Sequence, residues 1–270
     1  SSDVCSSDLD RIAVNATLPA VAPDLVERVL TNFGEFSTVK IKVAEAGHSI
    51  TDDIARIQKV RELYPDAKIR LDANGGLEIP NAIELVNQLQ ALEINIEYFE
   101  QPVASIAEMA ELRLQLSRIG VKIAADESVR KVSDPLAVAQ ANAADILVLK
   151  AAPLGGIERS LALAAHYRLP VVVSSALESA VGIGHGIRLA GALPSLDFAC
   201  GLATGQLLAS DIANIPIEGG KMRVADVTPS EASMIEFEAS AERTQWWQDR
   251  VRNTWSAGAD EIIGEMGWHW

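Results

Sequence analysis

The sequence contains little of what several common classes of protein require. Only two of its 270 residues are cysteines, which excludes a disulfide framework and favours a reducing compartment, the cytoplasm. No apolar run reaches the roughly 18 residues that a membrane-spanning helix needs. The first residues also lack the basic and apolar regions of a secretory signal. We therefore expect a protein that is neither secreted nor embedded in a membrane.

Positive charge is scarce as well. The chain has 23 Lys and Arg residues against 37 Asp and Glu residues, and its net charge is -14. Nucleic-acid binding and adhesion to anionic lipid both depend on Lys and Arg side chains that neutralise phosphates. We therefore expect no nucleic-acid and no membrane partner, and instead a small anionic carboxylate substrate. The sequence does not determine the oligomeric state, and an oligomer stays an open alternative.

What the sequence does contain is a series of short apolar runs. Six of them end in a residue that can hold a metal ion or a proton. The runs recur at intervals of 24 to 30 residues, about the length of one strand, one helix and their loops. The six residues at their ends are Lys42, Asp72, Glu100, Asp126, Lys150 and Ser174.

Buried strands that alternate with amphipathic helices predict an α/β fold with a parallel sheet. Seven strands and a shorter eighth run at 197–201 favour a (β/α)8 TIM-like barrel, in which the carboxyl ends of all strands meet at one face. An open doubly wound sheet is the alternative, because counting strands does not prove closure. We predict a non-native leader over 1–9, the barrel over 10–205 and a C-terminal segment over 206–270 that packs outside it.

Three carboxylates end three successive predicted strands. Asp72, Glu100 and Asp126 would meet at the carboxyl face of the barrel, where hard oxygen ligands suit Mg²⁺, with Mn²⁺ as the alternative. Asn74 and Glu127 stand beside them for supporting hydrogen bonds. Alternatively, each acid caps the helix that follows it. Zinc is disfavoured because no Cys or His has ligand spacing. The four histidines show no pairing in the sequence, and we expect them to be surface or core residues.

Lysines also stand at the ends of buried runs. Lys42 and Lys150 belong to the second and sixth predicted strands, and Lys40 points to the same side as Lys42 because side chains alternate along a strand. Burial and a neighbouring cation both favour the neutral form of an amine, which can then act as a base. We predict that the two lysines flank a substrate. A structural ion pair with a barrel carboxylate and a Schiff-base lysine are the alternatives.

The segments around these residues resemble one known family. In chain order they are VAEAG, LDANGG, EQPVA, ADESVRK, LKAAPLGGI, VVVSSALESAVGI, ACGLATG and QWWQDRV. Over residues 10–251 the chain is similar to the muconate lactonising enzyme subgroup of the enolase superfamily, and within it to the bacterial o-succinylbenzoate synthase branch. The resemblance implies a (β/α)7β barrel, Mg²⁺ and a lysine base.

The resemblance also implies a reaction. This is the syn-dehydration of 2-succinyl-6-hydroxy-2,4-cyclohexadiene-1-carboxylate to o-succinylbenzoate in menaquinone biosynthesis. Lys42 would remove the proton next to the carboxylate and later protonate the departing hydroxide, while Lys150 would stay protonated and support the enediolate. The metal ligands would be Asp72, Glu100 and Asp126, and the substrate-binding residues Lys40, Asn74, Ser174 and Ser175, with the serines at the succinyl carboxylate.

Other functions remain open at this point. An N-succinylamino acid racemase needs the same two lysines. A dipeptide epimerase is less favoured, because only Asp197 stands where an acidic pair would bind an amine. An inactive barrel that serves as a scaffold is the alternative of another class. Members of the family carry an α+β capping domain ahead of the barrel, so we expect a chain that is truncated at its start and either weakly active or insoluble.

Overall fold

The computed structural model describes residues 9–130 and 136–259. The leader predicted over residues 1–9 thus lies, apart from Leu9, outside the described residues. The chain divides into two compact units, which meet in the sequence between Pro229 and Ser230. The domain boundary that we placed after residue 205 stays a prediction.

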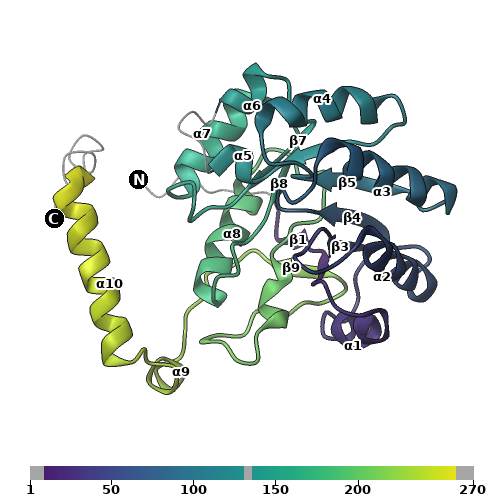
Figure 1. Ribbon diagram of the computed structural model, residues 1–270. Helices are drawn as coiled ribbons and strands as arrows, with labels where there is room; N and C mark the ends of the chain where they lie inside the picture. Colours follow the sequence, from purple (N-terminus) through teal and green to yellow (C-terminus); the bar gives the residue numbers. More distant parts are fainter. Residues whose placement is uncertain (1–8, 131–135, 260–270) are drawn as a thin grey trace. The chain divides into compact units, whose positions relative to one another are not determined.

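A parallel sheet of seven strands forms the centre of the first unit. The strands lie side by side in chain order, so each strand pairs with the next one along the sequence (Figure 1). This order results when each crossover is short and contains one helix. The strands are β2 (Ala16–Leu18), β3 (Thr38–Lys42), β4 (Lys68–Asp72), β5 (Ile96–Glu100), β6 (Ile123–Ala125), β7 (Ile146–Leu149) and β8 (Val171–Val173).

Two residues close the sheet into a ring. Cys200 forms a parallel bridge with Val14, and Gly201 forms one with Ser174. The backbone N–H of Cys200 donates to Ala13 at 2.7 Å, and that of Gly201 donates to Val173 at 2.8 Å. The short run at 197–201, to which both residues belong, thus takes the place of an eighth strand. The predicted (β/α)7β barrel is confirmed, and the open sheet is excluded.

Helices cover the outside of the ring, and α2, α3 and α4 follow one another around it (Figure 1). Their apolar stripes face the strands, as α3 illustrates with buried residues at helical spacing from Ala82 to Leu89. Capping boxes at Ser49 and Ser105 start α2 and α4. The helical segments of this unit are η1 (Pro23–Leu25), α1 (Val26–Thr31), α2 (Ile50–Leu63), α3 (Ile79–Ala91), α4 (Ile106–Ser117), α5 (Glu127–Arg130), α6 (Ala137–Gln140), α7 (Ile157–Tyr167), α8 (Ala180–Ala192) and η2 (Ala203–Leu207).

The segment RIAVNATL, residues 11–18, has the pattern of one strand and is the first strand that the sequence predicts, but it forms two strands in the structure. β1 (Arg11–Ala13) pairs antiparallel with β9 (Lys221–Arg223) outside the ring, whereas β2 belongs to the ring. The chain changes partner around Asn15, whose side-chain amide donates to the carbonyl of Ala16 at 2.9 Å. The expectation of one continuous strand is wrong, because periodicity does not reveal a partner that stands far later in the chain.

The second unit contains helices with an exposed aromatic surface. Ser230 and Ser240 cap α9 (Glu231–Glu236) and α10 (Ala241–Thr254), and a π-helical turn, η3 (Trp255–Ala259), follows. Trp246 and Trp247 contact each other edge to face and are 45% and 51% exposed.

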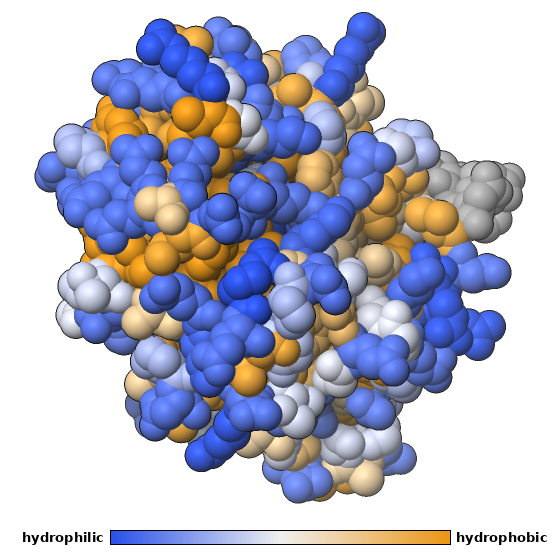
Figure 2. Space-filling view, turned by 90° about the vertical axis from the view of Figure 1, so that its right-hand side faces the viewer, coloured by the Kyte–Doolittle hydropathy of each residue, from blue (hydrophilic) through white to orange (hydrophobic). Residues whose placement is uncertain are grey.

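Polar residues cover most of the protruding surface on the face shown in Figure 2, and apolar residues appear mainly between them. No helix within residues 9–130 and 136–259 combines the length and apolar character that crossing a bilayer requires.

Candidate active site

The strand register brings the predicted site residues to one end of the barrel. Lys42 lies opposite Asp72, and Asp72 lies opposite Glu100, at the carboxyl ends of β3, β4 and β5. Asp126 and Lys150 directly follow β6 and β7. Because the strands are parallel, all these side chains converge although they are far apart in the sequence.

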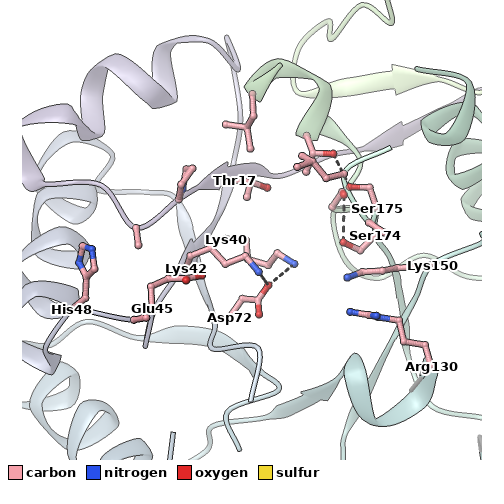
Figure 3. A pocket seen from close by; sticks show the side chains of 18 residues that line it. Thr17, Lys40, Lys42, Glu45, His48, Asp72, Arg130, Lys150, Ser174 and Ser175 are labelled. Carbon is pink, nitrogen blue, oxygen red and sulfur yellow. Dashed lines mark hydrogen bonds and ion pairs between the residues drawn. The ribbon is translucent and has the colours of Figure 1, made fainter. Parts of the chain in front are cut away.

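A cavity of about 780 Å³ opens at this end, a size typical of small-molecule sites. Lys40 and Lys42 reach Asp72 from one side, while Lys150 and Arg130 point inward from the opposite side (Figure 3). Of the remaining predicted residues, Ser174 and Ser175 line the cavity, whereas Asn74, Glu100 and Asp126 do not belong to its lining.

Each lysine of the site contacts a carboxylate. The Nζ of Lys40 donates to Oε1 of Glu100 at 2.9 Å and lies 3.1 Å from Oδ2 of Asp72. The Nζ of Lys42 donates to the same Asp72 oxygen at 2.7 Å.

Across the cavity, the Nζ of Lys150 donates to Oδ2 of Asp126 at 2.6 Å. The ion-pair alternative therefore describes how these side chains are arranged. The roles of Lys42 and Lys150 in catalysis stay predictions.

Burial and these contacts set the charges of the site. Burial opposes the charge of Lys40, but Glu100 and Asp72 outweigh it and raise the pKa of Lys40 well above its ordinary value. Burial would raise the pKa of Asp72, yet the ammonium groups of Lys40 and Lys42 hold it well below its usual range. Burial and the charge of Asp72 raise the pKa of Glu100 to about 7, against the opposing effect of Lys40. Of the three acids, Glu100 is thus the easiest to protonate, because the pKa values of Asp72 and Asp126 are lowered.

The three acids fit a divalent cation in type and placement. Asp72, Glu100 and Asp126 are at most 1% exposed. Burial is the largest cause of the raised pKa of Glu100, and the charges of the two aspartates raise it further. Crowded carboxylates of this kind are the ligands that Mg²⁺ prefers. As the side chains stand, however, no three acids, histidines or cysteines within the described ranges are grouped to hold a metal. The lysines and Arg130 occupy their oxygens instead.

Residues next to the acids hold them in place. Asn74 accepts from Lys42 at 2.5 Å, and its amide donates to Glu127 at 3.3 Å. Gln101, buried and directly after Glu100, accepts through Oε1 from the backbone N–H of Asp126 at 3.2 Å. Sequence reasoning did not identify Gln101, although its position immediately after a strand-end acid was a signal.

Hydroxyl groups line the side of the cavity formed by β8 and the closing run. The hydroxyls of Ser175 and Thr204 lie 2.6 Å apart, and Ser174 donates weakly to the carbonyl of Gly201 at 3.4 Å. A Cβ at Gly201 would lie 2.5 Å from the hydroxyl oxygen of Ser174, so this close approach requires glycine. Thr17 of β2 adds another hydroxyl to the lining.

Sequence reasoning missed other lining residues. Arg130 was part of a quoted motif but was given no role, and it donates from Nε to Asp126 at 2.9 Å. His48 was expected to be a surface or core residue, and it is exposed. It also lines the cavity and accepts a hydrogen bond from Arg56 at 3.0 Å. The partner comes from helix α2, and no sequence spacing indicated it.

Comparisons with known proteins agree with this geometry. Residues 22–229 match the family described as enolase C-terminal domain-like. The chain is 51% identical over 249 residues to the o-succinylbenzoate synthase of Mycobacterium tuberculosis, covering 92% of this chain and 74% of the relative. It is 49% identical over 244 residues to the enzyme of that name from Mycolicibacterium smegmatis, covering 90% and 74%.

Solved structures show the same fold. The L-Ala-D/L-Glu epimerase of Bacillus subtilis is similar with a TM-score of 0.70 at 27% identity, over 83% of this chain and 63% of that one. The N-succinyl Arg/Lys racemase of Bacillus cereus is similar with a TM-score of 0.73 at 23% identity, over 86% and 64%. The chain therefore spans less than two thirds of the length of these two solved proteins.

Proposed function

Because the chain belongs to the enolase C-terminal domain-like family, we propose that it dehydrates 2-succinyl-6-hydroxy-2,4-cyclohexadiene-1-carboxylate to o-succinylbenzoate. The observation that carries this proposal is the pair of lysines on opposite sides of one cavity, Lys42 and Lys150, each backed by a buried carboxylate. The names of the curated relatives support the same reaction, and a small anionic carboxylate is the partner it requires.

Lys42 is the residue that we assign to proton transfer. Its side chain is 26% exposed and lines the cavity, whereas Lys40 beside it is 7% exposed and held by Glu100. In the proposed reaction the amine of Lys42 takes the proton from the carbon next to the ring carboxylate. It then returns that proton to the hydroxyl group that departs, so water leaves and the ring becomes aromatic. A single base on one face accounts for a syn elimination.

Lys150 would act as a fixed positive charge. Its Nζ is held by Asp126 and faces the cavity from the side opposite Lys42. Arg130 adds a second cation on that side, where it contacts both Asp126 and Glu127. A preorganised cation stabilises negative charge that develops on a substrate during proton removal.

A metal ion belongs to the proposal as well. Asp72, Glu100 and Asp126 would hold Mg²⁺, with Mn²⁺ as the alternative. When bound, the ion supplies positive charge against the negative charge that develops on the substrate carboxylate. Ser174 and Ser175 would donate hydrogen bonds to the succinyl carboxylate. Lys40 and Asn74 would be further substrate-binding residues. A role in menaquinone biosynthesis and a cytoplasmic location follow from the family and are proposed with it.

A direct assay tests the reaction. The chain is incubated with the dehydration substrate and Mg²⁺, and the formation of o-succinylbenzoate is followed by its absorbance. We expect Lys42→Ala to lower kcat by roughly 10²- to 10⁴-fold, the usual contribution of a general acid or base. We expect Lys150→Ala to lower kcat by roughly 10²- to 10³-fold, the usual cost of removing a group that stabilises developing charge. Lys59→Ala on helix α2, whose lysine pairs with Glu62, serves as the control. Full turnover by both site variants would refute the assignment.

Racemisation of N-succinylamino acids is the second candidate. Two amines on opposite sides of a cavity are what a racemase needs, because a proton must leave one face of a carbon and arrive on the other. Incubation of an N-succinylamino acid in deuterium oxide distinguishes the two functions. Incorporation of deuterium with inversion of the N-succinylamino acid would favour the racemase if the chain also fails to dehydrate the substrate of the first assay.

A further inference from the structure

His48 lies at the rim of the cavity, in the loop between β3 and helix α2. It lines the cavity on the side of Lys42, away from Ser174 and Ser175 (Figure 3). His48 is exposed, so it is accessible to a molecule that enters the cavity. Nothing in the reaction described above uses this side chain.

Arg56 of helix α2 holds the loop that carries His48. The Arg56 side chain is 1% exposed, and its guanidinium donates to the carbonyl of Val21 at 2.8 Å and to that of Lys42 at 3.0 Å. It also donates to Asp53 at 2.7 Å. One buried group therefore ties the rim of the cavity to the strand that presents Lys42.

The same guanidinium determines which nitrogen of His48 carries a proton. Its Nη2 lies 3.0 Å from Nδ1 of His48. Because a guanidinium only donates, Nδ1 must be the acceptor, and the proton of the neutral ring then resides on Nε2. His48, which lines the cavity, thus has an N–H donor at Nε2 on a ring whose other nitrogen is held by Arg56.

We propose that His48 is a substrate-binding residue whose Nε2–H donates to an uncharged oxygen of the substrate, either the succinyl ketone or the ring hydroxyl. Glu45 lines the same part of the rim, and its carbonyl accepts from the backbone N–H of His48 at 3.0 Å, so both residues belong to one tight turn. A substrate carboxylate at this place would meet the charge of Glu45, whereas a ketone or hydroxyl would not. The inference rests on the proposed function, which supplies the substrate.

Two substitutions of His48 test the roles of its two ring nitrogens separately. In His48→Asn the side-chain oxygen still accepts from Arg56, but no donor remains at the position of Nε2. In His48→Gln an amide N–H reaches that position. We expect KM to rise about three- to tenfold for His48→Asn with kcat nearly unchanged, and KM to stay within about twofold of wild type for His48→Gln. His185→Asn, the same change at an exposed histidine of helix α8, is the control.

The dissociation constant of o-succinylbenzoate distinguishes the two oxygens. The product keeps the ketone and lacks the ring hydroxyl. If His48→Asn weakens product binding as much as it raises KM, the ketone is the acceptor. If it raises only KM, the hydroxyl is the acceptor. Equal KM values for His48→Asn, His48→Gln and wild type would overturn the proposal.

The tautomer of His48 provides a readout that does not depend on turnover. Nitrogen NMR of the imidazole, assigned by comparison with His48→Gln, should show a protonated Nε2 and an unprotonated Nδ1 at mildly alkaline pH. The opposite tautomer would overturn the proposal even in an active enzyme. A wild-type chain with the expected tautomer but no dehydration would instead refute the proposed function, and with it the substrate assigned to His48.

Discussion

Gln101 holds the backbone of Asp126 through its side-chain oxygen, which accepts from the Asp126 N–H at 3.2 Å and from the Ser128 N–H at 3.1 Å. Its amide donates to the Ser128 hydroxyl at 2.7 Å and to the carbonyl of Val103 at 2.9 Å. One buried amide therefore connects the end of β5 with the beginning of helix α5. The position of Asp126 depends on a residue that does not itself face the cavity.

Replacing this amide should affect stability and activity together. Gln101→Leu leaves the N–H groups of Asp126 and Ser128 without their acceptor, and each unsatisfied buried group costs about 1–3 kcal/mol. We expect a lower free energy of unfolding in urea and a lower kcat, because Asp126 is released. Gln88→Leu on the exposed face of α3 is the control. An unchanged kcat in a folded Gln101→Leu protein would contradict the positioning role.

Gly201→Ala tests the contact that closes the ring. The added Cβ would lie 2.5 Å from the Ser174 hydroxyl oxygen, so one of the two segments must shift. Overpacking of this kind costs about 1–3 kcal/mol, and we expect KM to rise because Ser174 lines the cavity. Gly205→Ala is a matched control, since its Cβ would come no closer than 3.9 Å to Asp211. Thermal unfolding and steady-state kinetics of both variants make the comparison.

Cys200 should not react in the folded protein. Its side chain is fully buried, and burial raises the pKa of the thiol to about 12, so almost no thiolate exists near neutral pH. In a Cys5→Ser background we expect slow reaction with a disulfide reagent at about pH 8, and rapid reaction after unfolding in guanidinium. Rapid modification of the native protein would show that the closing run opens readily.

The protonation of Glu100 predicts a pH dependence of stability in the metal-free protein. Its pKa is raised from an ordinary 4.5 to about 7, chiefly by burial and by the charge of Asp72. Between these values the unfolded chain releases the proton that the folded chain keeps. The free energy of unfolding should therefore fall as pH rises through this window, by at most about 1.4 kcal/mol per pH unit.

Urea unfolding at several pH values, with a chelator present, measures this slope. Glu100→Gln should remove it, whereas Glu84→Gln on the exposed face of α3 should leave it unchanged. Asp72 does not interfere, because its lowered pKa places its own contribution at more acidic pH, where stability is lost as pH falls. Identical slopes for wild type and Glu100→Gln would show that another group is responsible.

The convergence of the site could be predicted because it depends on a regular feature of the chain. Lys42, Asp72 and Glu100 end successive strands, and parallel strands in register place such residues side by side. The ion pairs among them were foreseen as an alternative, since buried lysines need partners. Periodicity could not predict which residues of the irregular segments belong to the site. His48 and Thr204 lie outside the strands, and their directions depend on contacts with Arg56 and Ser175.

The first strand illustrates the same limit for the fold. Residues from Arg11 to Leu18 have an apolar residue at every second position without a break, yet the first half pairs with Lys221–Arg223 and the second half with β3. A sequence pattern indicates that a segment is buried and extended, but it does not indicate which neighbour supplies the hydrogen bonds. Partners far apart in the chain become visible only in three dimensions.

The barrel has a narrow seam on each side of its closing run, where residues 200–201 meet the segment before β2 and the end of β8. Only single bridges join Gly201 to Ser174 and Cys200 to Val14, whereas β3 and β4 pair over five residues. Local opening should begin at such a seam, because few hydrogen bonds have to break. The segments beside the seam also line the cavity, through Thr17, Ser174 and Thr204. A substrate that binds all three residues would connect these segments and stabilise the closed barrel while it is bound.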